Sequence, residues 1–216
     1  MKKESIFIEG LESFINGELI KRPSEVFQKI ENIAIEKKFP ILSPMSGHVL
    51  SFLVKEFSPK KILELGTGLG YSILWIMSSG IKLEKIRTLD RSIESLDYAK
   101  KFLKEGSLHF EKIEFILDWA VEFLKKSPEI ATDSDFIFVD CDKVFYPEIL
   151  KELMNTCKKG TSIVFDNVLW HGRVMNRTLN KNSDLAIQQF WTDIKKSDWK
   201  STLFPAGDGL LLLRLE

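Results

Sequence analysis

Two short apolar runs, each followed by acidic or amide side chains, constrain the fold of this chain most. Phe136–Val139 is followed by Asp140, and Ser162–Phe165 is followed by Asp166 and Asn167. Both runs are rich in β-branched and aromatic residues, as expected for strands of a parallel sheet buried on both faces. The segment between them predicts a helix, so the unit is βαβ and its strands run parallel. Parallel strands end at the same edge of a sheet, where open α/β folds bind their ligands.

The side chains that follow these two strands predict a site for a divalent cation. Asp140, Asp166 and Asn167 supply two carboxylates and a carboxamide, which are the oxygen ligands that Mg²⁺ prefers and that Mn²⁺ or Ca²⁺ can also accept. An aspartate at the end of a strand can instead cap the next turn. Two such aspartates, an asparagine and the nearby Lys143 together favour the cation site.

From Lys61 onward the chain alternates between strand, turn and helix patterns. This alternation predicts an α/β fold with a doubly wound, mostly parallel, seven-stranded sheet. The predicted strands are Lys61–Leu65, Lys85–Leu89, Ile113–Leu117, Asp135–Val139, Thr161–Phe165, Thr202–Pro205 and Leu210–Leu215. The predicted helices are Tyr71–Ser78, Ile93–Lys104, Ala120–Lys126, Tyr146–Thr156 and Asp184–Lys196. The short connection between the last two strands predicts an antiparallel hairpin at the sheet edge.

The residues before this sheet predict three helices. One apolar face runs along Ile8–Ile15, and a second helix begins near Pro23 and ends before Pro40. A third helix has Ser43 as its N-cap and Pro44 at its first position.

Length and composition favour one domain that is not embedded in a membrane. We expect a single domain over residues 1–216, with N-terminal helices in 1–58 and the α/β core in 59–216. Lys+Arg and Asp+Glu both total 31, so no overall basic field attracts nucleic acid. No apolar run approaches the roughly 18–20 residues that a membrane span needs, so we expect a cytoplasmic protein without a membrane partner.

A glycine-rich loop follows the first strand of the sheet. Its three alternating glycines lack the spacing of the dinucleotide fingerprint, because Tyr71 stands where the third glycine is required. Glu64 lies at the end of the first strand, and Asp90 ends the second strand, where a carboxylate can hold the hydroxyls of a ribose. S-adenosylmethionine has a ribose and cationic groups but no pyrophosphate, so the pattern favours it over NAD.

Four motifs of the chain resemble those of the metal-dependent S-adenosylmethionine O-methyltransferases, a family that includes catechol and caffeoyl-CoA O-methyltransferases and bacterial relatives. The motifs are Glu64–Ser72, Val139–Lys143, Asp166–Gly172 and Gly207–Leu210. The resemblance extends from about Ile41 to Leu215. It implies the Rossmann-like methyltransferase fold and an enzyme that transfers a methyl group to a substrate oxygen.

The same resemblance implies roles for the matching residues. Asp140, Asp166 and Asn167 would bind the metal, and Lys143 would act beside Asp140 as the catalytic base near the substrate hydroxyl. The implied cofactor contacts are Leu42, Glu64, Gly66, Thr67, Gly68, Tyr71, Ser72, Asp90, Ala120 and Asp142. The resemblance also implies a homodimer formed through the N-terminal helices.

The chain departs from the family pattern in ways that bear on the substrate more than on the reaction. His48 stands where relatives often have glutamine, Trp119 replaces a small residue, and Cys141 replaces an alanine. The long substrate-binding insertion of the plant caffeoyl-CoA enzymes also has no counterpart in this short chain.

Two substrate classes stay open. The first is a small aromatic diol, which Trp170 would help to enclose. The second is the wobble 5-hydroxyuridine of tRNA, which also offers two adjacent oxygens. A basic rim of Lys21, Arg22, Arg173 and Arg177 would favour tRNA, whereas the neutral net charge favours the small molecule. The glycine spacing disfavours a dehydrogenase, and the intact motifs disfavour a non-enzymatic binding module.

Overall fold

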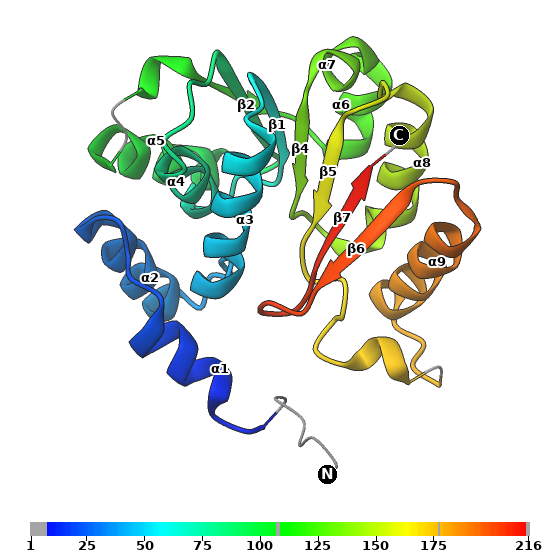
Figure 1. The fold of residues 1–216 in the computed structure, drawn as a ribbon, viewed down its shortest axis with the longest axis horizontal. Helices are drawn as coiled ribbons and strands as arrows, with labels where there is room; N and C mark the ends of the chain where they lie inside the picture. Colours follow the sequence, from blue (N-terminus) through cyan, green and yellow to red (C-terminus); the bar gives the residue numbers. More distant parts are fainter. Residues whose placement is uncertain (1–7, 107–108, 177, 215–216) are drawn as a thin grey trace.

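One sheet organises the part of the chain that the structure, a computed structural model, describes: residues 8–106, 109–176 and 178–214. The strands are β1 (Lys61–Leu65), β2 (Lys85–Asp90), β3 (Ile113–Leu117), β4 (Phe136–Val139), β5 (Ser162–Phe165), β6 (Lys200–Phe204) and β7 (Leu210–Arg214). Within these residues seven strands lie in the order β3-β2-β1-β4-β5-β7-β6 (Figure 1). β1 to β5 are parallel, and β7 is antiparallel to β5 and β6, which confirms the predicted fold class and hairpin.

Helices precede and connect these strands. They are α1 (Leu11–Phe14), the π-helix η1 (Ile15–Leu19), α2 (Glu25–Lys37), α3 (Pro44–Phe57), α4 (Tyr71–Ser78), α5 (Ile93–Gly106), η2 (Phe110–Lys112), α6 (Ala120–Lys126), α7 (Pro128–Asp133), η3 (Lys143–Phe145), α8 (Tyr146–Thr156), η4 (Arg173–Met175) and α9 (Asn182–Lys196). No helix in the described part of the chain is both long and apolar enough to cross a membrane.

Several elements differ from the prediction, the following three among them. α7 is additional, because its six residues are too few to show a helical periodicity. β6 begins at Lys200 rather than Thr202, because its outward-facing polar residues hide the strand pattern. The last residue of the predicted final strand, Leu215, lies outside the described residues.

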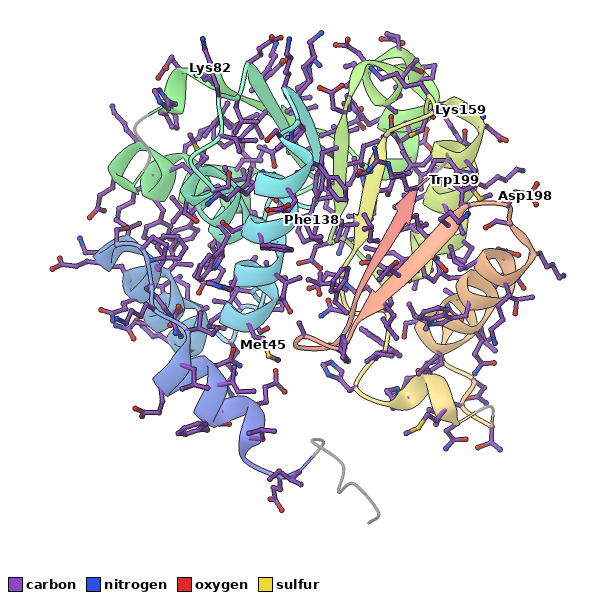
Figure 2. All side chains as sticks on the ribbon, viewed as in Figure 1. Met45, Lys82, Phe138, Lys159, Asp198 and Trp199 are labelled. Carbon is purple, nitrogen blue, oxygen red and sulfur yellow. The ribbon has the colours of Figure 1, made fainter. Side chains whose placement is uncertain are left out.

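The two faces of the sheet bury separate apolar cores. Phe136 and Phe138 of β4 point into a core formed with α2 to α5, and Figure 2 shows Phe138 between β4 and α3. Ile137 and Val139 point into the opposite core, formed with α6, α8 and α9. This alternation, with all four side chains buried, is why the strand sequence is apolar throughout.

The N-terminal helices differ in how firmly they are held. Ser43 caps α3 as predicted, and its Oγ accepts a hydrogen bond from the Ser46 N–H at 3.1 Å. The first predicted helix instead continues into a π-helix and buries none of its residues. Ile8 and Phe14 are 64% and 52% exposed, so the described residues of this chain do not cover their expected apolar face.

The contact between α3 and α4 generates a test of the fold. A methyl group added at Gly47 would lie 2.3 Å from Cδ1 and Nε1 of the buried Trp75. We expect Gly47→Ala to lower the free energy of unfolding by about 1–3 kcal/mol through overpacking, as measured by urea denaturation. Gly17→Ala is the matched control, because no atom lies within 4 Å of its added methyl. Equal stability of the two variants would show that the α3–α4 contact can accommodate a methyl group beside Trp75.

Candidate functional site

A cavity of about 730 Å³ opens at the carboxyl edge of the sheet. The residues proposed from the sequence that line it are Leu42, Gly66, Thr67, Gly68, Tyr71, Ser72, Asp90, Ala120, Asp140, Asp142, Lys143 and Asn167. The remaining two, Glu64 and Asp166, are buried at the ends of β1 and β5. The topology thus brings all of these residues to one edge of the sheet, and their functional roles stay predictions.

The glycine loop lies close against the neighbouring strand end. Gly66 has a φ of 108°, and a Cβ at this position would lie 2.1 Å from the backbone oxygen of Asp140. The backbone N–H groups of Gly66 and Thr67 both donate to the Leu89 carbonyl, at 2.9 and 3.1 Å. The loop that follows β1 is therefore fixed to the ends of both β2 and β4.

Glu64 supports the loop from beneath. Its two carboxylate oxygens accept hydrogen bonds from the hydroxyls of Ser72 and Thr88. The side chain is fully buried, and this burial raises the pKa of Glu64 to about 8. Glu64 therefore connects β1, β2 and the first turn of α4 directly below the cavity.

Asp90 joins the glycine loop to the end of β2. Its Oδ2 accepts a hydrogen bond from the Gly68 N–H at 3.0 Å, and its Oδ1 accepts one from the Ser92 N–H at 2.9 Å. Each oxygen of a carboxylate can accept a further hydrogen bond. Because Asp90 also lines the cavity, it can accept hydrogen bonds from ligand hydroxyls there.

Asp166 is the most unusual carboxylate of the site. It is 1% exposed, and its Oδ1 is buried without a hydrogen-bond partner among the described residues. Burial raises the pKa of Asp166 well above its usual range, and the nearby Asp140 carboxylate raises it further. A buried oxygen of this kind is costly unless a donor or a cation satisfies it.

The donor set around this oxygen fits a hard cation. Two carboxylates, from Asp140 and Asp166, and the amide of Asn167 follow adjacent parallel strands β4 and β5. Among the described residues, no three His, Cys, Asp or Glu side chains gather closely enough to hold a metal by themselves. A metal here would therefore depend on the carboxamide, and its open positions would face the cavity that Asn167 lines.

Lys143 is buried between these groups and the cavity. Its Nζ donates to Asp140 Oδ1 at 2.8 Å and to the Cys141 carbonyl at 3.1 Å. Burial by itself lowers the pKa of Lys143, but the carboxylates of Asp140 and Asp166 outweigh it and keep this pKa above its ordinary value. In this arrangement Lys143 is an ammonium paired with Asp140.

The loop after β5 has an uncommon backbone. Asn167, Trp170 and His171 have φ values of 54°, 51° and 52°, in the left-handed region. Residues with a Cβ adopt this region at a cost of roughly 1–2 kcal/mol each. Contacts from outside the loop must compensate for that cost, and they orient Trp170 on the wall of the cavity.

One of these contacts, Asp184, was not predicted from the sequence. Asp184 in the first turn of α9 accepts hydrogen bonds from Trp170 Nε1 at 3.0 Å and from Arg173 Nε at 2.7 Å. Its side chain is 1% exposed. An acidic residue in the first turn of a helix is usually a solvated one, so no sequence pattern marked Asp184 as an anchor for Trp170.

A second unpredicted contact lies at the mouth of the cavity. The guanidinium carbon of Arg91 lies 4.8 Å from the centroid of the Trp119 ring, a cation–π contact. Arg91 also approaches Asp142 Oδ2 at 3.9 Å. Trp119, one of the departures from the family pattern, therefore packs against a residue that directly follows Asp90.

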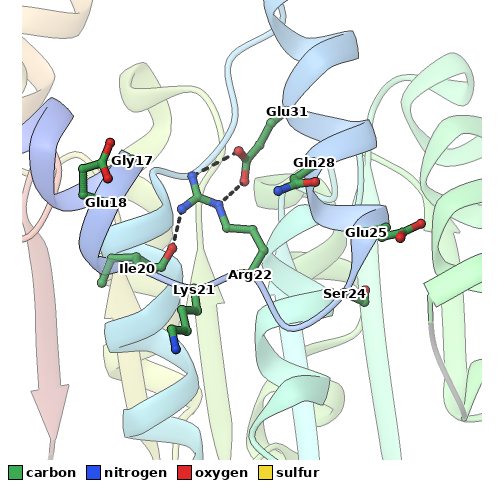
Figure 3. A pocket seen from close by; sticks show the side chains of 9 residues that line it. All are labelled: Gly17, Glu18, Ile20, Lys21, Arg22, Ser24, Glu25, Gln28 and Glu31. Carbon is green, nitrogen blue, oxygen red and sulfur yellow. Dashed lines mark hydrogen bonds and ion pairs between the residues drawn. The ribbon is translucent and has the colours of Figure 1, made fainter.

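The N-terminal segment forms a separate, shallower pocket of about 580 Å³ on α2 (Figure 3). Inside it, Arg22 is paired with Glu31 through Nε at 2.8 Å and Nη2 at 3.1 Å. Glu31 also accepts a hydrogen bond from the Tyr71 hydroxyl. Lys21 is exposed, and Arg177 of the expected basic rim lies outside the described residues.

Comparisons with known proteins agree with this fold. The O-methyltransferase family pattern matches residues 20–215. A caffeoyl-CoA O-methyltransferase of Stellaria longipes is 31% identical over 80% of this chain and 75% of its own length. A catechol O-methyltransferase of Niastella koreensis is 29% identical over 78% of this chain and 76% of its own length.

Solved structures show the same architecture. The O-methyltransferase from Bacillus cereus, in complex with SAH, has a TM-score of 0.82 at 24% identity and covers 95% of this chain and 97% of that one. TomG from Streptomyces achromogenes, in complex with SAM, has a TM-score of 0.80 at 22% identity, with 95% of each chain covered. At these identities the likeness concerns the fold, whereas the family match spans nearly the whole sequence. This protein belongs to the O-methyltransferase family.

Proposed function

We propose that this protein transfers a methyl group from S-adenosylmethionine to a small molecule with two adjacent oxygens, such as a catechol, and uses a divalent metal to do so. The observation that carries the proposal is the Oδ1 of Asp166, which is buried beside Asp140 and has no hydrogen-bond partner in the described part of the chain. A divalent cation held by Asp140, Asp166 and Asn167 would satisfy this oxygen. The relatives named caffeoyl-CoA and catechol O-methyltransferase support the substrate class.

The cavity wall suits S-adenosylmethionine as the methyl donor. When bound, this cofactor supplies the methyl group on a cationic sulfonium. Asp90 lies where a carboxylate can accept hydrogen bonds from ribose hydroxyls. Asp142 adds a carboxylate to the same wall, and a carboxylate attracts a cationic ligand, whereas Asp140 is paired with Lys143. The SAH and SAM complexes of the structurally similar enzymes support this choice.

The residues that follow β4 and β5 would orient the substrate through the metal. When bound by Asp140, Asp166 and Asn167, a Mg²⁺ ion would stabilise negative charge on a substrate oxygen and compete with Lys143 for the carboxylates. The aromatic ring of Trp170, held by Asp184, would limit where an aromatic substrate can lie. Positioning of this kind can contribute up to about 7–11 kcal/mol to lowering a barrier.

Lys143 is the residue we propose to receive the proton of the substrate hydroxyl. Its Nζ lies 2.8 Å from Asp140, so it is on the same wall as the proposed metal ligands. As an ammonium it cannot accept a proton, so it must first lose one. When Asp140 and Asp166 bind a metal instead of pairing with Lys143, these carboxylates no longer raise the pKa of Lys143. The burial of Lys143, which lowers this pKa, then favours the neutral amine.

The alternative of a tRNA substrate receives less support from the contacts of the basic residues. Arg22 is engaged in its pair with Glu31, and Arg173 is paired with Asp184. These two cations therefore do not form the expected rim of unpaired charge for phosphates. We keep the small molecule as the proposed substrate, and tRNA is the substrate to assay beside it.

A homodimer in the cytoplasm is also part of the proposal. The exposed apolar side chains of Ile8, Phe14 and Leu19 on the N-terminal segment support an interface at this place. Sedimentation of the purified protein as a monomer would exclude the dimer.

The proposed cofactor can be tested at Asp90. We expect Asp90→Ala to weaken the binding of S-adenosylhomocysteine by about 1–3 kcal/mol, measured by calorimetry, because ribose hydrogen bonds are lost. Asp97→Ala is the matched control, since the Asp97 side chain is 67% exposed on α5. Unchanged binding in Asp90→Ala, or tight binding of NAD to the wild type, would contradict the cofactor assignment.

The proposed metal can be tested at Asp166. EDTA should abolish turnover and Mg²⁺ or Mn²⁺ should restore it, while Asp166→Asn should lose at least about 100-fold in kcat, since a metal supplies several kcal/mol. Mg²⁺ should also raise the melting temperature of the wild type and not that of Asp166→Asn. The exposed Asp198, labelled in Figure 2, lies in the connection between α9 and β6 and does not line the cavity, so Asp198→Asn is the control. Full activity in EDTA without bound metal would refute the metal proposal.

The proposed substrate can be tested with pairs of phenols. A catechol can bind a metal through two oxygens, whereas a matched monophenol binds through one and keeps rotational freedom. Because a displacement of about 1 Å can cost roughly 100-fold in rate, kcat/KM should be far higher for the catechol. Assays with labelled S-adenosylmethionine should include tRNA. Comparable values for catechol and monophenol, or methylation of tRNA alone, would show that the substrate proposal is wrong.

A further inference from the structure

The tip of the β6–β7 hairpin lies between the start of α3 and the loop after β5, and this loop lines the cavity with Asn167, Trp170 and His171. This tip, residues Ala206–Gly209, lies beside the start of α3, next to the labelled Met45, and beside the loop after β5 (Figures 1 and 2). On the α3 side, Ser46 Oγ donates to the Ala206 carbonyl at 3.1 Å. On the other side, the N–H of Val168 donates to the Gly209 carbonyl at 3.1 Å.

Asp208 makes the closest contacts between this tip and the loop. Its backbone carbonyl accepts a hydrogen bond from the Leu169 N–H at 3.0 Å. Its carboxylate Oδ1 accepts one from the His171 N–H at 2.6 Å, and its Oδ2 lies 3.4 Å from His171 Nδ1. The side chain is only 13% exposed. The Asp208 carboxylate is therefore directed at the loop and not at solvent.

The hairpin itself does not need this carboxylate. Its turn is closed by a backbone hydrogen bond from the Gly209 N–H to the Ala206 carbonyl at 3.0 Å. The loop after β5 does need an external partner, because Trp170 and His171 both have left-handed backbones. The N–H of His171, one of these left-handed residues, donates to the Asp208 carboxylate.

We propose that Asp208 is a positioning residue for the reaction. By accepting the His171 N–H, it holds the left-handed turn in which Trp170 faces the cavity and from which Asn167 reaches the proposed metal site. Asp208 is not among the residues that line the cavity, so it acts through the loop and not on the substrate. The inference rests on the proposed function, since it concerns the orientation of the substrate and not the binding of the methyl donor.

Two substitutions separate the hydrogen bond from the charge. Asp208→Ala removes the acceptor for the His171 N–H, whereas Asp208→Asn keeps an oxygen acceptor of the same shape. With a catechol as substrate, we expect Asp208→Ala to lower kcat by about 10- to 100-fold, because displacement of oriented groups by about 1 Å has this effect. Asp208→Asn should recover most of this loss. Binding of S-adenosylhomocysteine should stay within about twofold in both variants, because Asp208 contacts Leu169 and His171 and not Asp90 or the glycine loop.

A second measurement tests the inference without any turnover. Hydrogen–deuterium exchange of a peptide covering residues 168–176 should be faster in Asp208→Ala than in the wild type and in Asp208→Asn, while the β1–α4 peptide stays protected. Absence of wild-type activity on catechols would refute the proposed function, and the exchange comparison would still test Asp208. Three results would overturn the inference. The first is an unchanged kcat together with unchanged exchange in Asp208→Ala. The second is a loss of kcat in Asp208→Asn equal to that in Asp208→Ala, and the third is a loss of S-adenosylhomocysteine binding that matches the loss of kcat.

Discussion

The close approach of the Gly66 backbone to the Asp140 carbonyl is the constraint on which the site depends. At this point the end of β1 touches the end of β4, and no side chain larger than hydrogen fits between them. The glycine loop and the acidic strand ends thereby share one cavity. A larger separation would divide the proposed cofactor region from the proposed metal region, and in-line transfer between them requires reacting atoms within about 3–3.5 Å.

The sequence was sufficient for the central strands of the sheet because these strands are buried on both faces. Phe136–Val139 and Ser162–Phe165 are apolar for that reason, and the polar residues that follow them mark the edge where a ligand can bind. Ser43 was recognisable as a cap because capping depends on local backbone geometry. Features fixed by neighbours in the chain were therefore predictable, as was the position of the cavity.

Features fixed by distant side chains were not predictable. Asp184 is buried because Trp170 and Arg173 come to it from another loop, and nothing in its own helix signals this. Arg22 was one of four residues whose basic rim would have favoured tRNA, but it is paired with Glu31 on α2. The environment of Lys143 also depends on two strand ends that are far apart in the sequence. These tertiary contacts determine which charged side chains are free to bind a substrate. Net charge and residue spacing alone therefore do not predict the substrate.

The edge strand β6 has a consequence for how copies of this protein can associate. It ends the sheet on one side, and Lys200 to Leu203 along it are exposed. The polar residues Lys200, Ser201 and Thr202 on this edge make further strand pairing unfavourable, as charged and polar edge residues do in sheets that resist aggregation. Association by extension of the sheet at the β6 edge is thus discouraged. The same polar residues also work against pairing of this edge with another chain during folding, before the apolar central strands are buried.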